Sequence, residues 1–131
     1  MLGAVGDDAF ATRLINNLRM HGVNCDSTTQ HDGVASGLAI IAVDLSGQNS
    51  IMVVPGANSK LSKSSVQAAE TLLKGSDCLI IQLETPIESV LEGIRLARRY
   101  GVRVILDPAP APSEIVPSLL QVDLICPNET E

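Results

Sequence analysis

Oxygen-bearing side chains follow three apolar runs of the sequence, each near the point where the run ends. They are Glu84, Asp107, Asn128 and Glu131. A carboxylate can hydrogen-bond the hydroxyl groups of a ligand, and carboxylate and amide oxygens are the ligands that hard divalent cations take in proteins. If the three runs are strands of one sheet, these side chains line one of its edges and suit hydroxyl groups or a divalent cation.

Each of these residues also has a purely structural interpretation. A carboxylate directly after a strand, such as Glu84, is often a helix cap or a solvated loop residue. Asp107 precedes a proline, and aspartate before proline commonly opens a turn. Asn128 and Glu131 have the spacing of a helix N-cap and its capping-box partner. The residues by themselves leave both interpretations open.

Alternating strand and helix patterns position these side chains. The runs that predict strands are 78–83, 102–106 and 123–126. The first, CLIIQL, is apolar except for one glutamine, which is typical of a strand covered on both faces. The helices expected in this region span 62–74, 86–100 and 114–120. Strands that alternate with helices form parallel β-α-β units, and such sheets bind ligands beyond the carboxyl ends of their strands.

The clearest local signal is the start of the helix that follows Glu84. Thr85 is expected as its N-cap, Pro86 as its first residue and Glu88 as the partner in a capping box. The helix is expected to run to Tyr100 and to turn one apolar face inward. That face consists of Ile87, Val90, Leu91 and Ile94.

The N-terminal part of the chain has a different pattern. A strand at 2–6 and a helix at 9–21 come first. Apolar, β-branched segments at 37–44 and 49–55, separated by a turn, then predict a β-hairpin. Because a hairpin breaks the alternation of strand and helix, we interpret it as an insertion at about 34–57 that projects from the sheet.

Composition and charge exclude several classes of partner. The chain has 131 residues and a formal net charge of −6, which argues against nucleic acid and against a basic membrane anchor. Its apolar runs are far shorter than the roughly 20 residues of a spanning helix, and its first residues do not resemble a signal peptide. Three widely spaced cysteines favour reduced thiols. We therefore expect a cytoplasmic protein with no nucleic-acid or membrane partner.

Several common catalytic motifs are absent from the sequence. It contains no GxxxxGK[ST] loop, no GxGxxG fingerprint, no GxSxG elbow and no HExxH pair. Nucleotide phosphates remain possible ligands despite the negative charge, because Mg²⁺ can mediate their binding.

Five motifs together give the chain a family resemblance. They are GDD at 6–8, GLAIIAVDLSGQNSIMVVPGAN at 37–58, IIQLETP at 80–86, DPAPA at 107–111 and PNETE at 127–131. In this order and spacing the sequence resembles the PfkB family of carbohydrate kinases, and within it the ribokinase group, over essentially its whole length. The resemblance implies a ribokinase-like α/β fold: a partial Rossmann-like parallel sheet with flanking helices and a small β-hairpin lid.

The resemblance also implies an activity and the residues that serve it. The activity is ATP-dependent phosphorylation of D-ribose at O5, with Mg²⁺, with a monovalent cation (K⁺) in the full-length family, and with a homodimer formed through the lid. Glu84 matches a glutamate that binds sugar hydroxyls. Asn128 and Glu131 match an NxxE motif at the Mg²⁺ and phosphate site, where Glu131 acts through water. The lid positions that close over the sugar are Ala39, Ile41 and Val53.

Other functional parts of the family are expected outside this chain. They include a sugar-contacting aspartate, a GGKGAN segment and the GAGD motif with the catalytic base. The 131 residues are therefore expected to be an inactive internal fragment. Asp107 stands where the family commonly has asparagine. The alternatives are a PfkB kinase for another sugar or a nucleoside, and a truncated, non-catalytic module for sugar binding or dimerisation.

Overall fold

A computed structural model of the chain describes residues 1–112, 114 and 116–129. The chain divides into two compact units, Met1–Lys60 and Leu61–Glu131. Both units combine helices with parallel strands, so the predicted α/β class is confirmed. None of the helices in the described residues is long and apolar enough to cross a membrane.

The first unit begins with a β-α-β motif. Strand β1 (Leu2–Val5) pairs in parallel with β2 (Ser27–Gln30), and helix α1 (Ala9–Met20) connects the two. Gly22 follows the helix in the left-handed conformation, with a φ of 77°. The unit ends with the 3₁₀ helix η1 (Gly56–Lys60). The sequence does not predict β2, because its residues STTQ are polar and show no apolar alternation.

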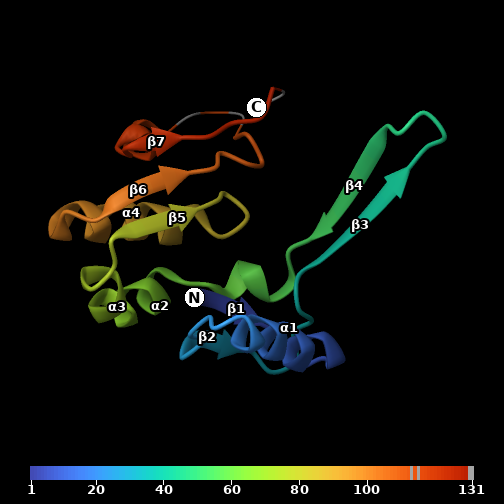
Figure 1. Ribbon diagram of the computed structural model, residues 1–131, viewed down its shortest axis with the longest axis horizontal. Coiled ribbons are helices and arrows are strands. Elements are labelled where there is room, and N and C mark those ends of the chain that lie inside the picture. The colour runs from blue at the N-terminus through green and yellow to red at the C-terminus, as the bar shows by residue number, and fades with distance from the viewer. Residues whose placement is uncertain (113, 115, 130–131) are drawn as a thin grey trace. The chain divides into compact units, whose positions relative to one another are not determined.

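The predicted hairpin is confirmed and extends away from α1 and β1 (Figure 1). Its strands are β3 (Leu38–Val43) and β4 (Asn49–Val54), which pair antiparallel, and every residue of both is exposed. The carboxylate of Asp44 shapes the turn between them, since its Oδ1 accepts the N–H groups of Ser46 at 2.8 Å and Gln48 at 2.9 Å. The hairpin is therefore held by its own ladder and turn.

The second unit contains a parallel sheet with strand order β5-β6-β7. Its strands are β5 (Cys78–Ile81), β6 (Arg103–Leu106) and β7 (Leu124–Ile125). Its helices are α2 (Lys63–Ala68), α3 (Glu70–Lys74), α4 (Ile87–Tyr100) and the 3₁₀ helix η2 (Pro117–Leu120). The three strands predicted for this region are confirmed, each shorter than predicted.

The helix predicted at 62–74 is divided in two. Its start is as expected, because the Ser62 hydroxyl accepts the Ser65 N–H at 3.1 Å. At Ala69 ψ is 13°, and its N–H is shared between the carbonyls of Ser65 and Val66, so α2 ends there and α3 begins at the next residue. The short helix predicted at 114–120 is reduced to η2; residues 113 and 115 lie outside the described residues.

The predicted capping box at the start of α4 is wrong. Pro86 is extended, with φ −53° and ψ 132°, so it is the N-cap rather than the first helical residue. Its carbonyl accepts the N–H groups of Ser89 at 2.9 Å and Val90 at 3.2 Å. Among the described residues no side chain caps this helix. The late start leaves Thr85 and Glu88 in the wrong positions for a box.

One face of α4 packs against one face of the sheet and forms the core of the second unit. The buried cluster is Val90, Ile94, Ala97, Val102, Val104, Leu106 and Leu119. Burial of a side chain the size of Ile94 contributes about 1.5–3 kcal/mol. On the opposite face Ile80 is 71% exposed. Within the described residues β5 is therefore covered by α4 on one face, and the predicted covering of both faces is wrong because the face that carries Ile80 is exposed.

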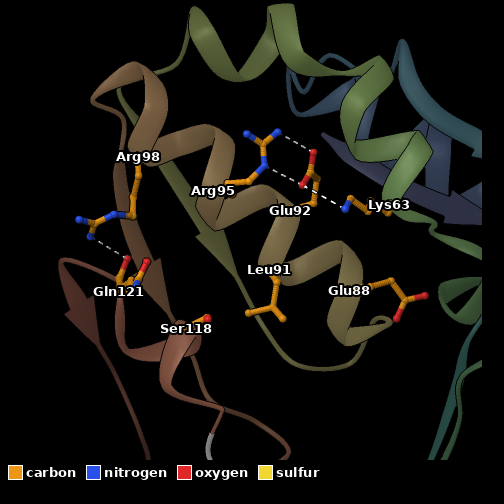
Figure 2. Close-up of a pocket in the computed structure, with 8 residues that line it drawn as sticks. All are labelled: Lys63, Glu88, Leu91, Glu92, Arg95, Arg98, Ser118 and Gln121. Atoms are coloured by element: carbon orange, nitrogen blue, oxygen red, sulfur yellow. Dashed lines mark hydrogen bonds and ion pairs between the residues drawn. The ribbon is translucent and has the colours of Figure 1, made fainter.

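A buried carboxylate ties α2 to α4 (Figure 2). Glu92 is 3% exposed and accepts two hydrogen bonds from Arg95, at 2.9 Å from Nε and 2.8 Å from Nη2. Gln67 of α2 donates a third at 2.9 Å, and the Lys63 ammonium lies 3.9 Å away. The hydrogen bonds from Arg95 and then Gln67 lower the pKa of Glu92 from 4.5 to about 2, against the opposing effect of burial.

Neutralising this carboxylate is expected to weaken the second unit. Glu92→Gln should lower the free energy of unfolding by about 2 kcal/mol, because hydrogen bonds to a charged group are lost. The matched change Glu88→Gln, on the exposed side of the same helix, should have almost no effect. Thermal unfolding followed by circular dichroism measures both.

The same network predicts the pH dependence of stability. Because the pKa of Glu92 is lower in the folded chain than the ordinary 4.5, its stabilisation is complete above that value and is lost as the pH falls towards about 2. The Glu92→Gln variant should lack this part of the acid destabilisation. If the free energies of unfolding of the variant and the wild type fell by the same amount between pH 4.5 and about 2, Glu92 would not be the source of this pH dependence.

Candidate functional site

The carboxyl ends of β5, β6 and β7 lie side by side. Ile81 pairs with Leu106, which pairs with Ile125, so the last residues of the three strands are in register. The strands are parallel and point in one direction (Figure 1). The segments that follow them therefore leave from the same edge of the sheet, where sheets of this kind bind ligands.

Pairing between β5 and β6 continues beyond the ends of the strands. The Asp107 N–H donates to the Ile81 carbonyl at 2.9 Å, and the Leu83 N–H donates to the Ala109 carbonyl at 2.9 Å. These bonds hold the segment that leads to Glu84 against the one that follows β6. Glu84 and Asp107 thus follow strand ends at a common edge, and each is placed by backbone hydrogen bonds.

The two carboxylates at this edge differ in what they contact. The half-buried Asp107 accepts the Ala109 N–H at 3.2 Å through Oδ1, so its interpretation as a turn residue is confirmed. Glu84 is exposed and lies before Pro86, whose carbonyl begins α4. Glu84 is therefore not a helix cap, and its carboxylate stands at the surface beyond β5.

Asn128 follows the third strand. The Cys126 N–H donates to the Leu106 carbonyl at 2.9 Å, which extends the β6–β7 pairing towards this residue. Asn128 is exposed and is held by an interaction of its own. Glu131, its expected partner, lies outside the described residues, so their joint role at a phosphate site stays a prediction.

The three predicted lid residues share one face of the hairpin. Ala39 is paired directly with Val53, and Ile41 lies two residues along β3 and pairs with Ile51. Side chains alternate between the faces of a ladder, so these residues point to the same side. All are exposed. The hairpin belongs to the first unit and the strand-end edge to the second.

The donors at the strand ends suit a metal held largely through water. No group of three or more His, Cys, Asp or Glu side chains able to hold a metal is found in the part of the chain that the structure describes. Mg²⁺ usually keeps several waters and takes one or two carboxylates together with substrate phosphates. Within the described residues the strand-end edge carries separate oxygen-bearing side chains rather than a closed cage, which fits a metal bound largely through water.

A shallow pocket of about 430 Å³ lies elsewhere in the second unit, along α4 (Figure 2). Lys63, Arg95 and Arg98 line it, together with the carboxylates of Glu88 and Glu92. Arg98 also donates to the Gln121 carbonyl at 3.3 Å. None of the residues predicted as site residues lines this pocket, so it is separate from the strand-end edge.

The family model described as pfkB family carbohydrate kinase matches residues 1–131. The chain belongs to this family. Relatives agree over its full length: it is 36% identical over 131 residues to a ribokinase of Schizosaccharomyces pombe. It is also 38% identical over 132 residues to a deoxyribokinase of Salmonella typhi. The resemblance identified from the five motifs is thereby confirmed.

Solved structures agree with the fold. The chain is similar to Arabidopsis thaliana ribokinase complexed with ribose and ATP, with a TM-score of 0.87 and 27% identity over 98% of this chain. The ribokinase-like α/β fold predicted from the sequence is confirmed. This chain covers 43% of that structure and 41% of the Schizosaccharomyces pombe relative, so it spans about two fifths of the proteins it matches.

The contact between Asp8 and Ser36 at the base of the hairpin is not predicted from the sequence. Asp8, which caps α1, also accepts hydrogen bonds from Ser36. The GDD motif draws attention to Asp8, but Ser36 lies 28 residues further along in a loop without a distinctive pattern. No local signal in the sequence could have paired them.

Proposed function

We propose that this chain is part of a sugar kinase that transfers the γ-phosphoryl group of ATP to O5 of D-ribose. In this reaction the bond from the γ-phosphorus to the β–γ bridging oxygen breaks, a bond from O5 to phosphorus forms, and the O5 proton passes to a base. What carries the proposal is the match to ribokinases over the full chain, together with oxygen donors at one edge of a parallel sheet.

Within this proposal Glu84 positions the sugar. Its carboxylate is exposed beyond β5 and is not used to cap α4, so it can accept hydrogen bonds from ring hydroxyls. Orienting the acceptor is much of what phosphoryl transfer asks of a protein, because the reaction needs positioning and charge neutralisation more than covalent help.

The hairpin face formed by Ala39, Ile41 and Val53 is proposed to cover the sugar. An apolar lid excludes the water that would otherwise accept the phosphoryl group. Asn128 and Glu131 are proposed to act at the phosphates, where bound Mg²⁺ neutralises charge and Glu131 contacts the ion through water. The catalytic base and the monovalent-cation site are proposed to lie in other parts of the kinase.

A second candidate substrate is 2-deoxyribose. The observation that favours it is the 38% identity to a deoxyribokinase, which is as high as the identity to ribokinases. The two sugars differ only in the 2-hydroxyl group. The ratio of kcat/KM for ribose and 2-deoxyribose, measured with the complete kinase, decides between them.

We also propose a homodimer formed through the hairpin, in a cytoplasmic setting that suits three free thiols. The face opposite the proposed sugar face is apolar and exposed; its members are Leu38, Ile40, Met52 and Val54. A hairpin of two strands is marginally stable alone, so covering this face in a second copy stabilises it.

Glu84→Gln tests the proposed sugar contact. In the complete kinase the KM for ribose should rise by about tenfold to a hundredfold with kcat changed much less, because a charge-assisted hydrogen bond to the sugar is lost. The KM for ATP should stay the same. Glu88→Gln is the control. Equal effects of the two changes on the KM for ribose would rule out the role of Glu84.

The isolated chain should show no phosphoryl transfer. Incubated with ATP, Mg²⁺ and ribose, the purified residues 1–131 should form no ribose 5-phosphate above background by mass spectrometry, because the base is proposed to lie elsewhere. Sustained formation of the product by the pure chain would contradict that division of residues.

Ile40→Lys tests the proposed dimer face. Sedimentation velocity of the wild type should show a dimer, and Ile40→Lys should shift it to monomer, because a charge would be buried at the interface. Ile41→Lys, its neighbour on the opposite face, should leave the dimer intact. Dissociation by both changes alike would argue against a specific face.

A further inference from the structure

Two short connections join the hairpin to the rest of the first unit. Residues 34–37 lead into β3, and Pro55 and Gly56 lead out of β4. The Ala57 N–H donates to the Ala35 carbonyl at 2.8 Å, which ties the two connections together. Ala57 is fully buried, so this hairpin root, defined as residues 34–37 and 55–57, is packed even though the strands beyond it are exposed.

Asp8 and Ser36 fix the entering connection to the start of α1. The Ser36 N–H donates to Asp8 Oδ2 at 2.6 Å, and the Ser36 hydroxyl donates to Asp8 Oδ1 at 2.9 Å. The Gly6 N–H in turn donates to the Ser36 hydroxyl oxygen at 3.0 Å. Ser36 is 5% exposed and Asp8 is half-buried, so these bonds are partly shielded from water.

The backbone around this contact is too close to allow much adjustment. A Cβ atom on Gly6 would lie 2.1 Å from the Val34 carbonyl oxygen and 2.5 Å from the Ser36 nitrogen. On the other side Gly56 has a φ of 52°, and a Cβ there would lie 2.5 Å from the Ala35 carbonyl oxygen. The entering connection is therefore enclosed between two glycines that permit direct backbone contact.

The Asp8 carboxylate serves two elements at once. Its Oδ1 also accepts the N–H groups of Phe10 at 3.1 Å and Ala11 at 2.9 Å, which cap α1. These hydrogen bonds, led by the one from the Ser36 N–H, lower the pKa of Asp8 below its ordinary value, so the carboxylate is ionised near neutral pH. The helix start and the hairpin root thus share one charged acceptor.

We infer that Asp8 and Ser36 are positioning residues that fix the direction in which the hairpin leaves the first unit. Within the described residues, β3 and β4 are exposed and are paired with each other, so the direction of the hairpin is set where it is anchored. On the proposed function, a loosened root misplaces the lid: it weakens sugar binding and admits water, while the chemical step itself is little changed.

The test is Asp8→Asn in the full chain, because this change separates the two roles of Asp8. Asparagine keeps Oδ1 as the helix cap but presents an NH₂ group to the Ser36 N–H, which leaves two donors facing each other. Ser36→Ala is a second variant that leaves the helix cap untouched. Asp44→Asn is the charge-matched control, since Asp44 accepts its turn hydrogen bonds through Oδ1 alone.

Hydrogen exchange measures the hairpin root directly. In Asp8→Asn the Ser36 amide should exchange about tenfold faster or more, because its charged acceptor is lost. The amides of α1 should be unchanged, and Asp44→Asn should leave Ser36 protected. Wild-type protection of Ser36 in Asp8→Asn would overturn the inference whatever the activity of the protein.

Kinetics of the complete kinase measure the consequence. Asp8→Asn and Ser36→Ala should raise the KM for the sugar by about fivefold with kcat within about twofold, and should increase the share of ATP hydrolysed without sugar phosphorylation. A loss of folded enzyme alone would lower kcat and leave KM unchanged. If the wild type phosphorylates no sugar but Ser36 exchanges faster in Asp8→Asn, the proposed function fails and the anchoring role stands.

Discussion

The parallel ladder that joins β5, β6 and β7 is the constraint on which the candidate site depends. Its register brings Ile81, Leu106 and Ile125 level with one another, so three separate segments of the chain emerge together. The ladder is in turn held flat against α4 by a single apolar stripe, and Glu92 fastens that helix to α2 from the other side. The segment that carries Glu84 is positioned by backbone hydrogen bonds of the sheet, so its place at the edge does not depend on contacts of its side chain.

The hairpin follows the opposite principle. It places almost no apolar surface in a core, and both of its faces remain exposed within the described chain. Its stability is local, and its position is decided at the small buried root beside Asp8 and Ala57. Because its stability is local, a change at this root alters the placement of the hairpin without disturbing the ladder between β3 and β4.

Most of the helices and strands can be predicted from the sequence, because the pattern of apolar residues indicates which side chains are buried. The apolar runs predict β5 and β6, and two apolar, β-branched segments on either side of a turn predict the hairpin. Three features could not be predicted, for physical reasons. Strand β2 is polar, and the break at Ala69 is a change of backbone conformation inside a continuous helical pattern. The late start of α4 depends on the extended conformation of Pro86. For the candidate site, residues after strands could be predicted, but the link of Asp8 to Ser36 spans 28 positions and has no local signature.

The pairing register of the hairpin carries information of its own. Ala39 faces Val53 on one side, whereas Ile40 faces Met52 on the other. Slippage by one residue would exchange the two sides completely, since side chains alternate with a period of two. Because both sides are apolar, hydrophobicity alone hardly distinguishes the correct alignment from the shifted one. The turn held by Asp44 fixes the pairing register instead. A single carboxylate at the far end of the hairpin thus decides which side chains each face presents.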